Sequence, residues 1–485
     1  MIRSLETGAR GVIAQRIGLE VTGNNISNVN TPGYTRERAN FRETAPLGTP
    51  KGLVGTGVNV ASVQRVRSEF YDREIRDATS RNENFKSDAT VVKRLEAILN
   101  EPTENGLDKF IKNFFDAFNQ LAQRPESLDI RSTVVNAASS MANEFNNLGA
   151  KIDNLKVDLL RKGQDNAVVI NRLTAEIASL NQQVANAISQ GSPDGSEFAD
   201  RRALAIEELS KYVNVSAFPV NNGMVNVQVG NSTLVTGGSA GRVQLRETVS
   251  PANERILTLQ QVDNNNQPIF ALNVQSGEMS SIMRSYNVTL NGTNSANAGF
   301  SIVQNLNQLA SQLVSKVNAV SRTGFAPGDT GATPPNRNIF TPASPAIPIT
   351  MNTIKLDNTA TGLGTSLNPN LIPTSSAQGE IGNADVARRI AELVNDTTFV
   401  GGTTYNDFYN VTLVNTGNIG NDALAGEQTT EQSKAQLSAL REGVNGVNLD
   451  EEAVNLIRFQ RAFEASARVI STSDQILQTL VNLGR

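Results

Sequence analysis

The sequence contains no cysteine, no histidine and no tryptophan among its 485 residues. The lack of cysteine excludes disulfides, thiolate metal ligands and cysteine nucleophiles. The lack of histidine excludes Ser-His-Asp hydrolysis, histidine-ligated zinc and histidine-based proton shuttles, because histidine is the usual general base near neutral pH. An enzyme would be left with carboxylate-based or lysine-based chemistry. Because the most common catalytic groups are missing, we expect a protein without enzymatic activity.

Long hydrophobic runs are also missing. No stretch approaches the roughly 18 apolar residues that a membrane-spanning helix needs, so we expect no membrane insertion. The first residues, MIRSLETGARGVIAQRIG, lack the apolar run of a secretory signal. The formal net charge of −4 gives no general attraction to nucleic acid, and we expect no nucleic-acid partner.

No motif for catalysis, a cofactor or a metal stands out. The glycine-rich GLVGTG at residues 52–57 lacks the Gly-Lys-Ser/Thr ending of a phosphate-binding loop. The acidic DEE at residues 450–452 fits the first turn of a helix, where the helix dipole favours negative charge. We therefore assign no catalytic residue, no cofactor and no metal ligand.

The N-terminal segment is predicted to be a helix over residues 2–29. Four apolar residues recur every seven positions, which is typical of one seam of a coiled coil: Leu5, Val12, Leu19 and Ile26. The helix then runs into an asparagine-rich stretch, and Pro32-Gly33 is expected to end it with a turn. Because an asparagine amide both donates and accepts hydrogen bonds, four asparagines are expected to satisfy backbone groups near this end: Asn24, Asn25, Asn28 and Asn30.

The C-terminal segment carries a matching pattern and is predicted to be a long helix that Asn448 caps. One seam consists of Leu449, Leu456, Phe463, Ile470 and Leu477, and a second of Phe459, Ser466, Ser473 and Leu480. The two ends are therefore expected to pair with each other through these seams.

The pattern between the ends predicts an α+β protein: terminal helices paired as a coiled coil, a long-helix bundle core, and a small, self-contained β-rich inserted outer domain. The expected boundaries follow. The terminal assembly domain is expected to comprise residues 1–60 and 445–485 and to be disordered in the monomer. The helical bundle is expected to comprise residues 61–215, 290–325 and 376–444. The β-rich outer insert is expected to comprise residues 216–289 and 326–375.

Both ends resemble a known family. The stretch GNNISNVNTPGYTRERANF resembles the N-terminal signature shared by the rod, hook and hook-associated proteins of the bacterial flagellum. The stretch GVNLDEEAVNLIRFQRAFEASARVIS is similar to the matching C-terminal signature, in the form typical of the members at the hook–filament junction.

The resemblance implies a structural axial component of the flagellum that forms a junction ring between hook and filament. It implies an extracellular location, reached through flagellar type III export without a cleaved signal. The implied partners are other copies of the chain in a ring-like homo-oligomer, the flagellar hook protein, the second hook-associated junction protein and a flagellar export chaperone. The expected assembly interface comprises Leu5, Val12, Leu19, Asn24, Asn25, Ile26, Asn28, Pro32, Gly33, Tyr34, Leu449, Leu456, Phe459, Phe463, Ile470, Leu477 and Leu480.

Two alternatives remain open from the residues. One is another axial protein of the flagellum, a hook or distal-rod protein. The other is an enzyme carried in the outer insert.

Overall fold

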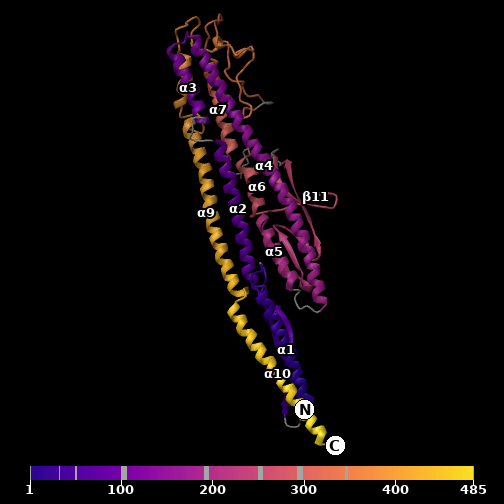
Figure 1. Ribbon diagram of the computed structural model, residues 1–485. Helices are drawn as coiled ribbons and strands as arrows, with labels where there is room; N and C mark the ends of the chain where they lie inside the picture. Colours follow the sequence, from indigo (N-terminus) through magenta and orange to yellow (C-terminus); the bar gives the residue numbers. More distant parts are fainter. Residues whose placement is uncertain are drawn as a thin grey trace.

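A computed structural model describes residues 2–31, 33–49, 52–99, 106–190, 196–249, 255–291, 299–344 and 348–483. The molecule is elongated, and both chain termini lie at its narrow end (Figure 1). The α-helices in these ranges are α1 (Ile2–Ser27), α2 (Glu69–Leu99), α3 (Leu107–Gln123), α4 (Leu128–Ser189), α5 (Ser196–Tyr212), α6 (Glu278–Arg284), α7 (Ile302–Ser321), α8 (Asp385–Glu392), α9 (Tyr405–Asn445) and α10 (Leu449–Leu483).

The long helices run along the molecule in a bundle. Helix α9 packs along α2, while α4 packs against α3 and α5 (Figure 1). Helix α3 contributes an aromatic stripe, Phe114, Phe115 and Phe118, that is buried because these positions fall on one helix face. The ring centroids of Phe114 and Phe118 lie 5.2 Å apart in an edge-to-face arrangement.

Small antiparallel sheets lie along α4. One has the order β5-β6-β7-β8 and the other the order β11-β10-β9. Their strands are β5 (Val215–Pro219), β6 (Val225–Val229), β7 (Ser232–Thr236), β8 (Ser239–Ala240), β9 (Arg242–Val249), β10 (Arg255–Val262) and β11 (Pro268–Ala271).

These sheets are not a self-contained outer domain, which corrects the expectation for residues 216–289. Asn171 of α4 accepts a hydrogen bond from Val243 N at 2.7 Å and donates one to Val243 O at 2.8 Å. A Cβ atom on Gly163 of α4 would lie 2.4 Å from Leu245 Cδ2, so the strand packs directly on the helix there. The inner faces of the strands and α4 therefore share one hydrophobic core.

Residues 326–375 are not β-rich in their described part, which corrects a second expectation. They form turns with two isolated bridges, Phe325–Ser375 and Phe340–Leu356. The side chain of Asn318 on α7 takes the place of a partner strand: it donates to Phe340 O at 2.7 Å and accepts from Ile339 N at 3.0 Å. This segment belongs to the core at the wide end of the bundle.

The narrow end consists of α1, α10 and a hairpin between α1 and α2. The hairpin strands are β1 (Glu37–Glu43), β2 (Leu47–Thr49), β3 (Gly52–Val54) and β4 (Val58–Arg65), with β1 paired to β4 and β2 to β3. Helices α1 and α10 lie side by side, and the β1–β4 pair packs on α1. The α+β class, with joined terminal helices, a long-helix bundle and small antiparallel sheets, is as expected. Within the described ranges, no helix combines the length and the apolar character needed to cross a bilayer.

Candidate functional site

Helices α1 and α10 meet through small side chains. A Cβ atom on Gly8 would lie 2.8 Å from Ile470 Cγ1, and one on Gly18 would lie 3.0 Å from the Phe459 ring. The buried face of α1 consists of Gly8, Gly11, Ala14, Gly18, Thr22 and Asn25. Because glycine has no side chain, these positions let the larger groups of α10 approach the α1 backbone.

The seam expected on α1 lies beside this contact and not at its centre. Its four members are only partly buried: Leu5, Val12, Leu19 and Ile26. The centre is occupied by glycine and alanine, because leucine at those positions would hold the helices apart. The large residues of the heptad pattern therefore flank a contact whose centre consists of small residues.

On α10, three of the four residues expected in the second seam face α1. Phe459 and Ser466 lie against Gly18 and Gly11, and Ser473 donates a hydrogen bond to Ser4 at 3.3 Å. Four residues of the first seam are partly buried: Leu456, Phe463, Ile470 and Leu477. Leu449 and Leu480 are about half exposed, at 50% and 47%, so they lie outside the contact.

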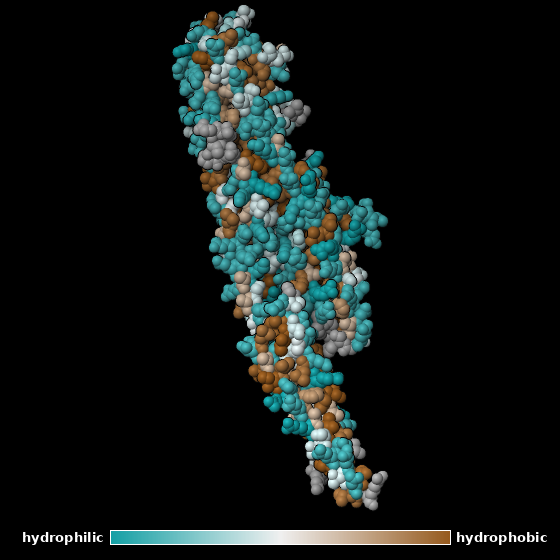
Figure 2. Space-filling view, in the orientation of Figure 1, coloured by the Kyte–Doolittle hydropathy of each residue, from teal (hydrophilic) through white to brown (hydrophobic). Residues whose placement is uncertain are grey.

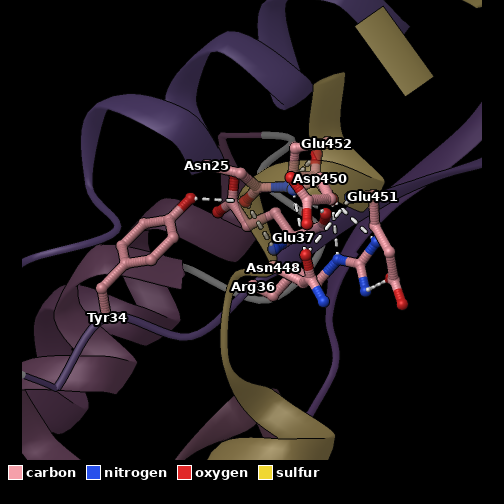
Figure 3. Close-up of polar contacts among 8 residues, drawn as sticks. All are labelled: Asn25, Tyr34, Arg36, Glu37, Asn448, Asp450, Glu451 and Glu452. Carbon is pink, nitrogen blue, oxygen red and sulfur yellow. Dashed lines mark hydrogen bonds and ion pairs between the residues drawn. The ribbon is translucent and has the colours of Figure 1, made fainter. Parts of the chain in front are cut away.

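Asn25 joins three segments of the chain. Its side-chain oxygen accepts hydrogen bonds from Tyr34 OH at 2.8 Å and from Glu37 N at 2.9 Å. Its side-chain nitrogen donates to Glu37 O at 2.9 Å and to Glu452 Oε2 at 3.2 Å (Figure 3). The side chain is 1% exposed, and both of its donors and both acceptor sites are in use. Asn25 thus bonds backbone groups of the loop after α1 and also Glu452, a C-terminal partner that the sequence pattern did not indicate.

Glu452, in the first turn of α10, is 2% exposed and pairs with Arg36. Arg36 donates from Nε to Glu452 Oε1 at 2.8 Å, and its NH1 nitrogen donates to Glu451 Oε2 at 2.8 Å (Figure 3). A buried carboxylate needs such a partner, because an unpaired charge in this position is strongly destabilising. Sequence reasoning missed Arg36, Glu37 and Glu452; the acidic run after the cap was the signal, and it was interpreted only as a dipole effect.

The caps and turns nearby follow the expected chemistry. Asn448 Oδ1 accepts from Asp450 N at 3.0 Å and Glu451 N at 3.3 Å, which caps α10. Gly33 has a φ of 79°, and a Cβ atom there would lie 2.4 Å from Leu204 Cδ1 of α5. Pro32 lies outside the described residues.

Asn24 and Asn28 are more exposed than Asn25 and bond to each other. Asn28 Nδ2 donates to Asn24 O at 3.0 Å and to Asn24 Oδ1 at 2.9 Å. Asn24 itself reaches Glu37 Oε2 at 3.3 Å. Among the four asparagines, only Asn25 is buried, so the four positions are not equivalent.

Tyr34 and Thr35 tie the same loop to the bundle. Burial, followed by nearby carboxylates, raises the pKa of the Tyr34 hydroxyl above its ordinary value, so it stays protonated and donates to Asn25. Thr35 donates from N and Oγ1 to the two oxygens of Asp200 on α5, at 3.2 and 2.9 Å. Arg65 of β4 contacts the same carboxylate at 2.5 Å.

We call the residues Asn25, Thr35, Arg36, Asp200 and Glu452 the joint. They connect α1, the loop after it, α5 and the start of α10. The backbone N of Arg36 also donates to Asn445 O at 3.0 Å, which attaches the end of α9. This arrangement attaches the paired terminal helices to the bundle.

Large apolar side chains remain exposed along α10. Figure 2 shows hydrophobic residues gathered over the narrow end and where it meets the wider part of the molecule. We call the following residues the α10 apolar set: Leu449, Val454, Ile457, Val469, Ile476, Leu480, Val481 and Leu483. An exposed apolar group of this size on one helix is typical of a surface that another protein covers.

Within the described ranges, no group of three or more histidine, cysteine, aspartate or glutamate residues is arranged to hold a metal ion.

Family models match both the ends and the middle of the chain. A model described as "Flagellar hook-associated protein FlgK helical domain" matches residues 92–334. The ends match "Flagella basal body rod protein" at residues 5–35 and "Flagellar basal body rod FlgEFG protein C-terminal" at residues 444–483. The terminal segments are thus similar to those of rod and hook proteins, while the middle is similar to a hook-associated protein.

Relatives match over nearly the full length. Flagellar hook-associated protein 1 of Bacillus subtilis is 24% identical over 99% of this chain and 97% of that protein. Flagellar hook-associated protein 1 of Salmonella typhimurium is 22% identical over 98% of both chains. A solved structure, the flagellar hook junction protein FlgK from Burkholderia pseudomallei, is 21% identical with a TM-score of 0.48, over 56% of this chain and 46% of that chain.

Proposed function

The chain belongs to the family of the flagellar hook-associated protein FlgK, structural proteins of the hook–filament junction, and we propose that its joined ends hold it in that junction. The observation that carries the proposal is the α10 apolar set at the narrow end. These side chains are exposed in the single chain, so their burial has to come from neighbouring subunits.

The neighbours are, in our proposal, other copies of this chain in a ring, the hook protein on one side and a second hook-associated junction protein on the other. The contact between α1 and α10 through small residues supports this proposal. It brings the two helices close together, so the pair is narrow and many copies can pack side by side in a ring. The interface then includes the exposed Leu449 and Leu480 in addition to the partly buried residues of both helices.

We also propose that α1 and α10 order fully only on assembly. Among the described residues of the two helices, Ala14 is the one hydrophobic residue that is fully buried. So little apolar burial leaves the ordering entropy of two long helices largely uncompensated in the monomer. Limited proteolysis of dilute monomer should trim both ends and leave residues of the bundle intact; protection of α1 under these conditions would contradict the idea.

Export to the outside of the cell is proposed to use the flagellar type III apparatus, with no cleaved signal and with an export chaperone as a further partner. We propose no enzymatic activity. The absence of histidine and cysteine from the whole sequence supports this, because it removes the most common acid–base and nucleophilic groups.

The decisive experiment uses Ile457→Glu in a strain that lacks this gene. Ile457 is 58% exposed, so the change leaves the single chain folded but places a charge on the surface that neighbours cover. We expect the variant to be exported into the medium without entering the junction, and cells to lose motility. Normal filaments on cells that carry the variant would refute the proposed interface.

A charge-matched control is Gln460→Glu, on the same helix and outside the α10 apolar set. Cells with this variant should swim normally. Measuring the protein in the culture medium separates a failure of assembly from a failure of export, because only an exported protein accumulates there.

A further inference from the structure

A second feature near the joint is a cleft that contains an excess of arginine. It has a volume of about 270 Å³ and lies between the start of α2, helix α5 and the strands β5 and β6. Its charged lining residues are Arg65, Arg67, Glu69, Asp72, Arg73, Arg76 and Arg202. Five guanidinium groups thus face two carboxylates, and we call this cavity the arginine cleft.

Asp72 in the cleft and Asp200 beside it already form ion pairs with arginines. Arg67 forms an ion pair with Asp72, and Arg65 forms one with Asp200 at 2.5 Å. The charges of Arg76 and Arg202 are left without an ion-pair partner among the described residues, although both side chains are more than nine-tenths buried, with 9% and 7% exposed.

Arg76 is the clearer of the two. Its Nε atom is fully buried and has no hydrogen-bond partner among the described residues. Burial lowers the pKa of the Arg76 guanidinium from its ordinary value, and the opposing effect of Asp72 is smaller. A buried charged donor without an acceptor is costly, so a ligand that supplies an acceptor would be stabilised there.

Arg202 is held in place by neutral groups. Its NH1 nitrogen donates to Asn181 Oδ1 at 2.9 Å and to Gly223 O at 2.8 Å. Burial, together with the charges of Arg65 and Arg67, lowers the pKa of the Arg202 guanidinium to about 10. The group is therefore fixed and still charged at neutral pH.

We propose that the arginine cleft binds an oxyanion, a phosphate, sulfate or carboxylate group, through Arg76 and Arg202. Guanidinium groups suit such ligands because their planar donors match the oxygen geometry. The oxyanion has two possible sources: a free inorganic anion, or an acidic side chain of a neighbouring copy. This inference does not depend on the proposed function.

The test titrates inorganic phosphate into the full-length protein at constant ionic strength, followed by calorimetry and by thermal unfolding. We expect saturable binding and a melting temperature that rises with phosphate, because a ligand that binds only the folded state stabilises it. Arg76→Gln should weaken phosphate binding about tenfold or more. Arg201→Gln, an exposed neighbour outside the cleft, is the matched control and should bind as the unaltered protein does.

The melting temperature in phosphate-free buffer shows whether Arg76→Gln loses phosphate binding only because it misfolds. Because Arg76 is buried without a partner, Arg76→Gln should melt at the same or a higher temperature than the unaltered protein in phosphate-free buffer. A lower melting temperature, or phosphate binding that Arg76→Gln leaves unchanged, would overturn the proposal, as would the absence of saturable binding.

Light scattering at high protein concentration distinguishes the sources. If a neighbouring copy supplies the carboxylate, both phosphate and Arg76→Gln reduce self-association. If a free anion occupies the cleft, self-association does not respond to either, while the binding and melting effects persist.

Discussion

The side-chain amide of Asn25 donates to the carboxylate of Glu452 at 3.2 Å, although 427 positions separate the two residues in the sequence. The first and last helices of the chain therefore meet in a buried polar contact. Because Arg36 pairs with the same carboxylate, the contact forms only when the start of α10 lies against the loop after α1. The joint thus couples the two ends to one another and to the bundle.

Replacing Asn25 should weaken the terminal pair. Asn25→Ala leaves the Glu37 backbone groups and Glu452 short of partners, and each buried unsatisfied group costs about 1–3 kcal/mol. We expect faster hydrogen exchange in α1 and the start of α10, with the bundle unchanged. Asn24→Ala, on the surface with mainly local bonds, is the control and should have little effect; equal exchange in both variants would contradict the role of Asn25.

Widening the contact between the terminal helices should separate them. In Gly8→Leu the new side chain meets Ile470, since a Cβ atom alone would lie 2.8 Å from Ile470 Cγ1. Overpacking of this kind costs about 1–3 kcal/mol, so protease sensitivity of both ends should rise. The control is Gly23→Leu, which makes the same change on the same helix. A Cβ atom at Gly23 meets nothing within 4 Å, so the new side chain should not disturb the contact. If the two variants are digested alike, close approach at Gly8 is not needed.

A charge at Phe463 should abolish assembly of the junction and motility. Burying such a ring contributes about 1.5–3 kcal/mol, and a carboxylate without a partner in its place adds a further penalty. Phe463→Asp should leave the melting temperature of the bundle nearly unchanged, because the ring lies on α10 and outside the main core. Motility assays and electron microscopy of hook tips provide the measurement.

The control for Phe463 is Gln460→Asp, which makes the same charge change on an exposed position of the same helix. These cells should swim. Normal swimming of the Phe463→Asp cells, or unfolding of the bundle in that variant, would show that the assigned role of this helix is wrong.

The ion pair between Lys316 and Asp396 should make stability depend on pH in acid. Hydrogen bonds from Lys316 and Thr398 lower the pKa of Asp396 from 3.8 to about 2. The ionised form is favoured in the folded state, so its contribution is present above pH 3.8 and is lost as the pH falls to about 2. Asp396→Asn should therefore reduce stability at pH 7, by about 1 kcal/mol or less, because both side chains of the pair are still partly exposed to water.

Thermal unfolding at several pH values measures this contribution. The melting temperatures of Asp396→Asn and the unaltered protein should converge as the pH falls from 3.8 to about 2. Asp422→Asn, on an exposed position of α9, should follow the unaltered protein at every pH. A gap between Asp396→Asn and the unaltered protein that stays constant down to pH 2 would contradict the assignment.

Local features of the chain were predictable because their causes are local. The helical ends follow from a seven-residue repeat, the start of α10 from the cap at Asn448, and the end of α1 from the turn at Gly33. The breaks that separate α2, α3, α4 and α5 coincide with proline and glycine in the sequence. Much of the helical layout needed no more than these signals.

The contacts between distant segments were not predictable in the same way. A seven-residue repeat marks where large apolar residues lie on a helix, but glycine carries no hydrophobic signal, so the contact centre at Gly8 and Gly18 stayed hidden. Likewise, residues 326–375 lack a strand pattern of their own, and Asn318, far from any motif, supplies their backbone partners.

The sequence by itself determined the secondary structure of the two ends, their likeness to flagellar axial proteins and the lack of histidine and cysteine chemistry, since each depends on residue type or short spacing. The tertiary structure alone decided that Asn25 meets Glu452, that the strands share the core of α4 and that Arg76 is buried without a partner. The physical reason is that burial and hydrogen bonding depend on which atoms approach in space. Local sequence patterns do not indicate which residues from distant parts of the chain come into contact.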